Sequence, residues 1–292
     1  MKKIFISVVI PTYNSKNKVI KAVKSLLNQT IDLLEIIVVD NGSSDQTSTK
    51  LQLVFGKKIK LIKLQENQGV TGGRNEGVKH LSAKSKMVLF FDHDMIADKK
   101  MVEELSKVFE TEKKVGIITP KIYYLSDKNI IWSAGTGINL LTGQVLFRGG
   151  VDKGQYDLLE PVQVAPAVML VKADVMKKLK GFDNKYFATF EDTDFCFRAN
   201  KIGYKTVYAP TAIAFHDLPL DKVGESKRLV KRMYWVGRNR ILFMKDFGQF
   251  WPIFLLFLIP LSAYYLLLCL KYGSITDYWQ FIKGTINGFL NK

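Results

Sequence analysis

The sequence Met87-Val-Leu-Phe-Phe-Asp-His-Asp-Met95 decides the predicted fold class of this 292-residue chain. Its first five residues, Met87–Phe91, are all apolar, which is the pattern of a strand buried on both faces of a parallel sheet. Asp92 and Asp94 follow directly, one residue apart. In extended geometry these side chains point the same way, so we expect both to converge just past the carboxyl end of the strand, where open α/β sheets bind ligands.

Two carboxylates held close together repel each other unless a cation lies between them. Mg²⁺ or Mn²⁺ holding a diphosphate would remove the conflict, because these ions favour carboxylate and phosphate oxygens. The alternative is an acidic loop that only caps the next helix, as Asp98 would do. These residues alone leave both interpretations open.

Strand-like and helix-like segments alternate along most of the chain. Strands are predicted at 4–10, 35–39, 59–64, 115–119, 162–171 and 205–208, and helices at 16–28, 46–55, 69–81, 99–111, 174–180 and 191–203. This alternation predicts an α/β fold with a mostly parallel sheet flanked by helices. Between them, residues 130–161 have the composition of hairpins and loops.

The composition narrows the classes of partner. A net charge of +16 is compatible with nucleic acid, an anionic membrane or a phosphorylated substrate. No zinc finger, RNA-recognition sequence or base-reading basic helix is present, so we expect no nucleic acid partner. The two cysteines form no disulfide framework, which fits a reducing compartment.

Several polar residues are predicted to share the sheet edge at which Asp92 lies. Asp40 ends the second strand. Its carboxylate would either accept hydrogen bonds from a nucleotide base or ribose or cap the following turn. Arg74 lies in a glycine-rich helix entry suited to anions. Three acids, Glu191, Asp192 and Asp194, lie at the start of a predicted helix. They either interact favourably with the helix dipole or include a general base. His216 is a lone histidine among apolar residues, and it is either a metal ligand or a structural residue of the core.

The combination of motifs resembles inverting family 2 glycosyltransferases with the GT-A fold, and in particular their rhamnosyltransferase-like branch. The matching segments, in the order of the family, are Ser7-Val-Val-Ile-Pro-Thr-Tyr-Asn14, Glu35-Ile-Ile-Val-Val-Asp-Asn-Gly-Ser-Ser-Asp45, Asn67-Gln-Gly-Val-Thr-Gly-Gly-Arg-Asn75, Asp92-His-Asp94 and Phe190-Glu-Asp-Thr-Asp-Phe-Cys-Phe-Arg198. The branch assignment comes from Arg238-Asn-Arg240.

The resemblance implies roles for individual residues. A UDP-, dTDP- or GDP-sugar donor would bind Pro11, Thr12, Asp40, Arg74, Asp92 and His93, and a Mg²⁺ or Mn²⁺ ion would bind Asp92, Asp94 and His216. Asp192 matches the general base. Acceptor or diphosphate contacts are expected from Glu191, Trp132, Arg238 and Arg240.

The C-terminal part predicts attachment to a membrane. Residues Trp251–Leu270 contain no charge and are long enough to cross a bilayer, and a basic zone precedes them. By the positive-inside rule the catalytic domain lies on the cytoplasmic side of the cell membrane. Pro260 and the amphipathic segment at 275–290 leave an interfacial arrangement open, and a buried core helix is the other alternative.

We therefore expect three parts: a GT-A catalytic domain at 1–220, a basic membrane-proximal segment at 221–246 and a membrane-attachment segment at 247–292. The predicted activity is transfer of a sugar to a lipid-linked or cell-envelope polysaccharide hydroxyl. Transfer to polyprenyl phosphate, and nucleotide-sugar binding without turnover, are the alternatives.

Overall fold

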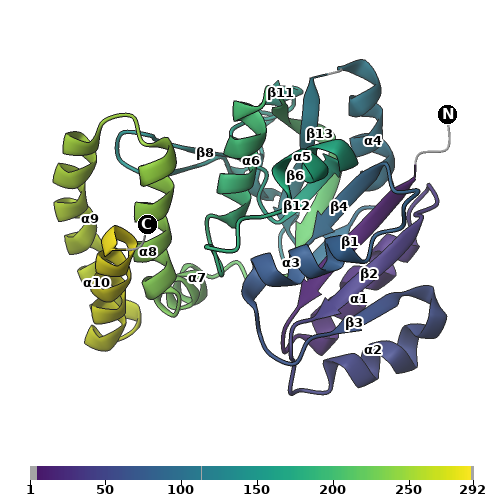
Figure 1. Ribbon diagram of the computed structural model, residues 1–292, viewed down its shortest axis with the longest axis horizontal. Helices are drawn as coiled ribbons and strands as arrows, with labels where there is room; N and C mark the ends of the chain where they lie inside the picture. The colour runs from purple at the N-terminus through teal and green to yellow at the C-terminus, as the bar shows by residue number, and fades with distance from the viewer. Residues whose placement is uncertain (1–4, 113, 291–292) are drawn as a thin grey trace. The chain divides into compact units, whose positions relative to one another are not determined.

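The computed structural model describes residues 5–112 and 114–290, which form two compact units (Figure 1). The first, which we term the sheet unit, comprises Met1–Thr136, Phe147–Phe187 and Glu191–Leu218. The second, the helical unit, comprises Gly137–Leu146, Ala188–Phe190 and Pro219–Lys292. The helical unit therefore takes in two short earlier segments besides the C-terminal part, while the predicted boundaries at residues 220 and 246 stay predictions.

The sheet unit is built on a mixed sheet of eleven strands. Its main path runs β10-β7-β6-β12-β4-β1-β2-β3, and β13 extends it by pairing with β5, β6 and β11. The strands β4, β1, β2 and β3 are mutually parallel, whereas β12 is antiparallel to both β4 and β6. The expected mostly parallel α/β sheet is confirmed. Its strands are β1 (Ile6–Thr12), β2 (Glu35–Asp40), β3 (Lys60–Lys63), β4 (Met87–Phe91), β5 (Met95–Ala97), β6 (Val115–Tyr124), β7 (Ile130–Ser133), β10 (Gly150–Val151), β11 (Glu160–Pro161), β12 (Val168–Lys172) and β13 (Lys205–His216).

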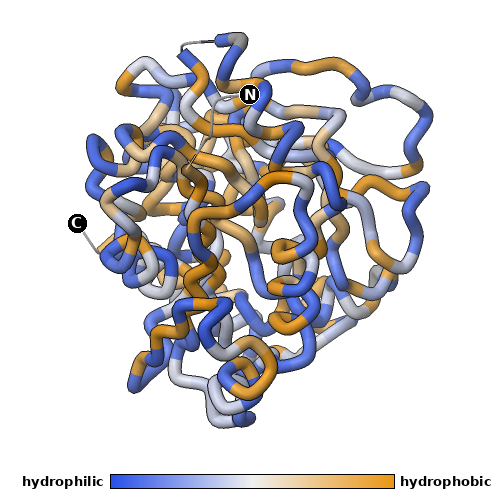
Figure 2. Tube along the Cα trace, turned by 90° about the vertical axis from the view of Figure 1, so that its right-hand side faces the viewer, coloured by the Kyte–Doolittle hydropathy of each residue, from blue (hydrophilic) through white to orange (hydrophobic). Residues whose placement is uncertain are grey.

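Alternate residues of β4 enter two separate hydrophobic cores, because successive side chains of a strand point to opposite faces. Leu89 and Phe91 join the core under α1 (Lys16–Leu27), α2 (Thr47–Phe55) and α4 (Met101–Thr111). Val88 and Phe90 join the core under α3 (Gly69–Lys79), α5 (Ala173–Leu179) and α6 (Glu191–Lys201). Figure 2 colours the trace by hydropathy, with hydrophobic residues in orange. Helices on both faces explain why the strand is apolar at every position.

The predicted strands differ from the observed ones chiefly at their ends. The β4 strand has the predicted bounds, but the strand expected at 4–10 is β1 at Ile6–Thr12, and Ile4 lies outside the described residues. The strand expected at 205–208 continues to His216, because a shift in register between Ala209 and Ile213 lets it keep pairing with β6. The strand expected from 162 begins only at Val168, after Pro166, which has no N–H to donate to a ladder.

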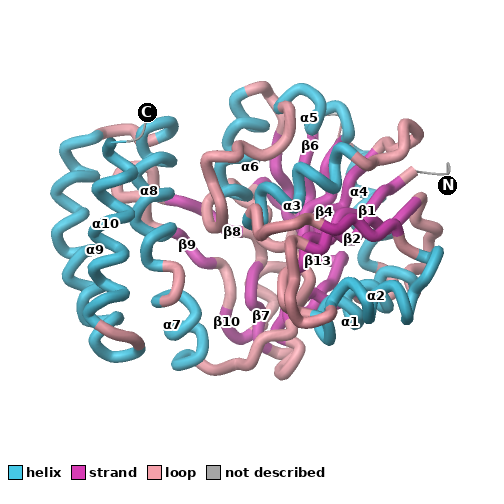
Figure 3. The backbone as a smooth tube through the Cα atoms, turned by 60° about the horizontal axis from the view of Figure 1, so that its bottom comes forward, coloured by secondary structure: helices cyan, strands magenta, loops and turns pink. Residues whose placement is uncertain are grey.

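In its described part the helical unit contains four helices: α7 (Lys222–Val230), α8 (Met233–Phe247), α9 (Trp251–Tyr272) and α10 (Ile275–Leu290). Helices α8, α9 and α10 lie side by side (Figure 3). Among the described residues, α9 is the one helix long and apolar enough to cross a membrane. A short 3-10 turn (Gly56–Lys58) and a separate two-stranded sheet of β8 (Thr136–Ile138) and β9 (Val145–Phe147) complete the secondary structure of the described residues.

Candidate active site

The ends of β1 and β2 bring the first predicted binding residues together. Thr12 pairs with Asp40 in the parallel register, and both side chains are buried. The Asp40 carboxylate accepts hydrogen bonds from the Ser43 amide (3.1 Å) and from the Ser48 hydroxyl. The Thr12 hydroxyl is buried without a hydrogen-bond partner in the described structure, so this edge retains one unused polar group.

Asn41 is a residue of this edge that the sequence interpretation missed. Its side-chain amide donates to the Gly69 carbonyl (2.7 Å) and its oxygen accepts from the Gln68 amide (3.0 Å). Gly69 has φ +74°, and a Cβ there would lie 2.1 Å from the Phe187 carbonyl oxygen. Asn41 thus fixes the beginning of α3, the helix that carries Arg74. Its position directly after Asp40 was the only signal in the sequence.

Arg74 is the centre of the buried charge network. It is almost fully buried, and its two terminal nitrogens contact the Asp92 carboxylate (2.8 Å) and the Glu191 carboxylate (3.5 Å). The guanidinium also lies over the Phe182 ring, 5.2 Å from its centroid. Arg74 therefore joins the loop after β4 to the beginning of α6, two segments more than 90 residues apart in the sequence.

The pKa values of Arg74 and Glu191 in this network differ from those of exposed side chains. Burial would lower the pKa of Arg74, but the carboxylates of Asp92, Glu191 and Asp192 raise it above its ordinary value. Burial, together with the Asp192 carboxylate, raises the pKa of Glu191 to about 7, although Arg74 opposes the shift. The Oε2 atom of Glu191 is buried without a hydrogen-bond partner in the described structure. One guanidinium thus offsets the charge of several carboxylates only in part. The raised pKa of Glu191 means that this acid binds a proton more readily than an exposed glutamate.

Asp192, the predicted general base, lies in the first turn of α6 and is partly exposed. Its Oδ1 accepts a hydrogen bond from the Thr193 amide (2.6 Å) and another from the Thr193 hydroxyl (3.2 Å). Burial raises its pKa, with Arg74 and Thr193 opposing. A carboxylate whose pKa is raised accepts a proton more readily than an ordinary aspartate. Asp194, by contrast, is paired with Arg198 (2.7 Å) and belongs to the structure of the helix.

Asp94 belongs to a second cluster, at the point where β13 ends. Its carboxylate lies 3.4 Å from Nε2 of His216 and 3.9 Å from Nζ of Lys18 on α1. Burial works against ionisation of Asp94, but His216, His93 and Lys18 outweigh it and hold the pKa below its usual value. Trp132 packs edge-on against His216, with ring centroids 4.4 Å apart. Lys18 is a second residue that the sequence interpretation missed, because its position on a helix surface carried no local signal.

The expected convergence of the two acids in extended geometry is wrong. The strand ends at Phe91, and a turn follows in which the Met95 amide donates to the Asp92 carbonyl (3.1 Å). Asp92 therefore faces Arg74 while Asp94 faces His216. Within residues 5–112 and 114–290, no three histidine, cysteine or acidic side chains form a group that could hold a metal ion.

Arg238 and Arg240, the predicted diphosphate contacts, lie on α8 in the helical unit. Arg240 is buried and donates to the Gly143 carbonyl (3.1 Å) and the Tyr265 hydroxyl (2.9 Å), so its contacts are internal to that unit. Arg238 donates to the Asn239 side chain (3.0 Å). Their role toward a ligand stays a prediction.

Asn239, between these two arginines, holds the loop that directly precedes Glu191 in the chain. Its fully buried amide donates to the carbonyls of Ala188 (2.7 Å) and Thr189 (3.0 Å). Thr189 and Phe190 both have φ +67°, a conformation that costs free energy for residues other than glycine. Asn239 thus stabilises a strained segment, and sequence patterns gave no sign of it.

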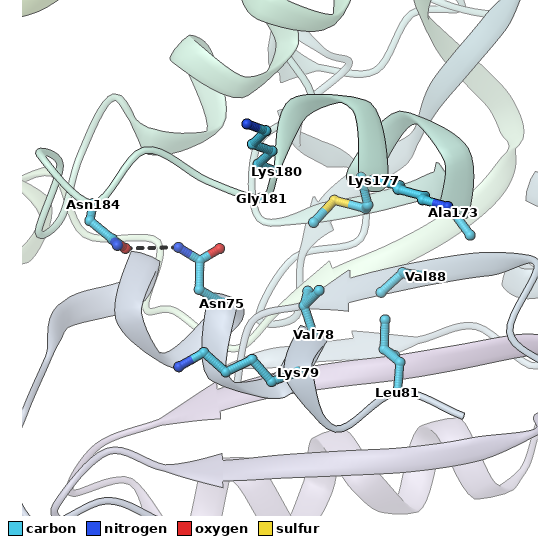
Figure 4. A pocket seen from close by; sticks show the side chains of 11 residues that line it. Asn75, Val78, Lys79, Leu81, Val88, Ala173, Lys177, Lys180, Gly181 and Asn184 are labelled. Carbon is cyan, nitrogen blue, oxygen red and sulfur yellow. Dashed lines mark hydrogen bonds between the residues drawn. The ribbon is translucent and has the colours of Figure 1, made fainter. Parts of the chain in front are cut away.

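A cavity of about 470 Å³ lies between α3 and α5 in the sheet unit. It is lined by Val78, Met176 and three lysines among others, and Asn75 reaches across it to Asn184 (2.8 Å; Figure 4). None of the predicted site residues lines this cavity. We therefore place the candidate site at the sheet edge and not here.

Comparison with known proteins gives consistent matches. The profile of glycosyl transferase family 2 matches residues 7–161, just over half of the chain, and that of glycosyl transferase family group 2 matches residues 87–287. The chain is 31% identical over 187 residues to the uncharacterized glycosyltransferase YfnE of Bacillus subtilis (strain 168), a match that covers 59% of the chain and 46% of YfnE. It is also 31% identical over 128 residues to the minor teichoic acid biosynthesis protein GgaA of the same strain, covering 42% of the chain and 28% of GgaA. The chain thus spans less than half the length of each of these relatives.

Among solved structures, S. aureus TarS 1–349 in complex with UDP superposes with a TM-score of 0.55 at 20% sequence identity. The match covers 82% of this chain and 66% of that one. At this level of identity the likeness concerns the fold, and it agrees with the expected GT-A arrangement.

Proposed function

Because the chain belongs to glycosyl transferase family 2, we propose that it transfers a sugar from a nucleotide-diphosphate sugar to a hydroxyl of a lipid-linked or cell-envelope polysaccharide acceptor. The observation that carries the proposal is the buried Arg74, paired with Asp92 and Glu191 next to Asp192. Arg74, paired with both carboxylates, holds these acids in place beside Asp192, and an acid with a raised pKa accepts a proton. The name of GgaA and the UDP complex of TarS support an envelope glycan and a nucleotide donor.

The nucleoside end of the donor is assigned to the ends of β1 and β2. Asp40 is buried at that edge opposite Thr12, whose hydroxyl is unpaired in the described structure, and Pro11 lies opposite the neighbouring Val39. An acidic acceptor together with an unused hydroxyl suits a base or ribose edge. A UDP-, dTDP- or GDP-sugar satisfies this chemistry equally well.

In the proposed reaction the acceptor oxygen forms a bond to the anomeric carbon while the bond from that carbon to the diphosphate oxygen breaks. Asp192 takes the proton of the acceptor hydroxyl, and the electron pair of the broken bond leaves on the nucleoside diphosphate. Arg74, paired with Asp92 and Glu191, holds these acids in place beside Asp192. A single displacement from the face opposite the leaving group inverts the anomeric configuration.

Asp94 and His216 would hold a divalent cation, whereas Asp92 is paired with Arg74. Mg²⁺ is usually held by one or two carboxylates and completed by substrate phosphates, so this small donor set is sufficient. Such an ion, Mg²⁺ or Mn²⁺, would supply positive charge toward the diphosphate. Lys18, 3.9 Å from the Asp94 carboxylate, balances the charge of that acid. Trp132 packs edge-on against the His216 ring.

Attachment to the cell membrane is also part of the proposal. One support is α9, because only 22% of its most apolar 18-residue stretch is buried in the protein. The other is the charge of residues 219–290, which contain ten Lys and Arg but four Asp and Glu. The excess of Lys and Arg beside an apolar segment favours the cytoplasmic face.

The test begins with thermal unfolding of the full chain in the presence of Mn²⁺ and each class of sugar nucleotide. A ligand that binds the folded state raises the melting temperature, so one nucleotide class should raise it and the others should not. Hydrolysis of that donor, followed by NMR, should release first the anomer opposite to that of the donor. Retention of the anomeric configuration would contradict the displacement mechanism. Binding without any turnover, even with polyprenyl phosphate or glycan acceptors, would indicate a non-catalytic binding protein.

A further inference from the structure

Helix α9 is apolar around its whole circumference but packs along only one stripe. The stripe consists of Phe254, Leu261, Tyr265 and Cys269, all buried. The opposite face carries Leu256, Ile259, Leu267 and Leu270, whose side chains are 58–70% exposed. A water-soluble helix places polar residues on its outer face, so this exposed face is suited to a non-aqueous neighbour.

Helices α8 and α10 are joined by close glycine contacts. A Cβ at Gly284 would lie 2.0 Å from the Tyr234 carbonyl oxygen, and one at Gly288 would lie 2.7 Å from that of Arg238. Gly237, on the other helix, faces Phe281 in the same way, at 2.5 Å. Small residues four positions apart let helix backbones approach closely. The two helices therefore move as one body.

Helix α9 is fastened to this pair by polar contacts as well as by packing. The Arg240 guanidinium donates to the Tyr265 hydroxyl (2.9 Å), and the hydroxyls of Ser262 and Tyr278 are 2.8 Å apart. Only Gly273 and Ser274 separate α9 from α10. The position of α9 in a bilayer thus determines where α8 and α10 lie.

That linkage argues against a simple span. Helix α8 carries Arg238, Arg240, Lys245 and Asp246, and α10 carries Asp277 and Lys283. If α9 crossed the bilayer with these helices attached, several of those charges would enter the hydrocarbon, where charged side chains are rare and costly.

The exposed residues of helix α10 indicate the depth at which the helical unit would lie in a membrane. It buries Phe281, Gly284 and Gly288, and its exposed residues include Ile275, Trp279, Ile286 and Leu290 at helical spacing. Lys283 is exposed on the same helix. An apolar stripe with tryptophan and bordering lysine is typical of a helix that lies at the boundary of headgroups and acyl chains.

Resting on the membrane attachment proposed above, we propose that the helical unit embeds in a single leaflet of an anionic membrane with α9 in the membrane plane. The face Leu256, Ile259, Leu267 and Leu270 contacts the acyl chains. The exposed Lys231, Arg232, Lys271 and Lys283 contact phospholipid headgroups.

The test measures the depth of four positions along α9 in the full chain. Cys196 and Cys269 are replaced by alanine, and single cysteines at positions 256, 259, 267 and 270 are labelled with an environment-sensitive fluorophore. The protein is bound to phosphatidylcholine vesicles with or without phosphatidylglycerol, and quenching by lipids brominated at different depths is recorded. In-plane binding predicts one shallow depth for all four labels and binding that requires phosphatidylglycerol.

A spanning helix would give a different profile. Depth would change progressively along the helix, and a cysteine replacing Lys271 would react with a membrane-impermeant thiol reagent only from the vesicle interior. That result would overturn the in-plane arrangement. A label at Asn200, an exposed residue of the sheet unit, is the control and should show no quenching at any depth.

Two further outcomes separate this inference from the proposed enzyme. Absence of vesicle binding, together with a dimer in light scattering without lipid, would assign the apolar face to a second copy of the chain and overturn the inference. The nucleotide-dependent rise in melting temperature, measured without vesicles, tests the sheet-edge site independently of either result.

Discussion

The sheet unit buries charge, whereas the helical unit exposes hydrocarbon. Arg74 and Glu191 are almost fully buried in the first, and Leu256, Ile259 and Leu267 are about two-thirds exposed in the second. Each arrangement inverts the usual distribution of a soluble protein, and each is costly for the isolated chain. This difference is the basis for assigning the two units different proposed partners: a nucleotide-sugar donor at the sheet edge and a lipid surface at the helices.

The largest predicted effect is on reaction rate and comes from a change beside the buried charges of the sheet unit. Replacing Asp192 with Asn removes the proton acceptor while keeping the shape of the side chain, so hydrolysis and transfer rates should fall by about 10²–10⁴-fold. Nucleotide binding, followed by thermal shift, should stay close to that of the wild type. Asp32→Asn, at an exposed position before β2, is the matched control and should leave the rate unchanged. Equal rates for Asp192→Asn and the wild type would remove Asp192 from its role as the base.

Arg74→Ala should destabilise the sheet unit most strongly among single changes. It leaves the Asp92 and Glu191 carboxylates without their cation, and breaking a buried ion pair costs about 3–5 kcal/mol. Chemical denaturation measures the loss. Adding Glu191→Gln in the Arg74→Ala background should recover part of it, because fewer unpaired charges then stay buried. A double variant no more stable than Arg74→Ala would show that Glu191 is not held by this arginine.

The same network predicts how stability depends on pH. The pKa of Glu191 is raised from 4.5 to about 7, so the folded state binds more protons than the unfolded state between these values. The free energy of unfolding should therefore fall as pH rises from about 4.5 to about 7, by on the order of 2–3 kcal/mol for this group. Glu191→Gln should flatten that slope. The exposed Glu66→Gln is the control and should keep the slope of the wild type.

Sequence patterns predicted the frame of the sheet unit well and its site only in part. Met87–Phe91 was predicted with its observed bounds because a strand covered on both faces has an unmistakable composition. The contact of Arg74 with Glu191 and that of Asp94 with His216 could not be derived from local sequence, since each joins segments more than 100 residues apart. The turn after Phe91 depends on the antiparallel pairing of β5 with β13, which no periodicity reveals.

Asn239 is, like its neighbour Arg240, a buried polar residue of the helical unit, and its replacement should have a moderate effect. Asn239→Ala removes two hydrogen bonds to the Ala188 and Thr189 carbonyls, each worth about 1 kcal/mol, from a loop that is already strained. We expect a loss of about 1–2 kcal/mol in denaturation. Thr189→Gly in the same background should restore part of it, because glycine tolerates positive φ. No recovery would indicate that backbone strain does not contribute.

The smallest effect on folding, and the sharpest contrast, should come from the exposed face of α9. Leu267→Gln places a polar group where the leucine is 68% exposed, so the free energy of unfolding in solution should change by less than about 0.5 kcal/mol. Leu261→Gln, on the buried stripe of the same helix, should destabilise the helical unit clearly. In binding to anionic vesicles the order reverses: Leu267→Gln weakens binding although the fold is intact. If Leu267→Gln destabilised the protein in the absence of lipid as much as Leu261→Gln does, the face would be packed within the protein, and the contrast between a buried-charge unit and an exposed-hydrocarbon unit would fail.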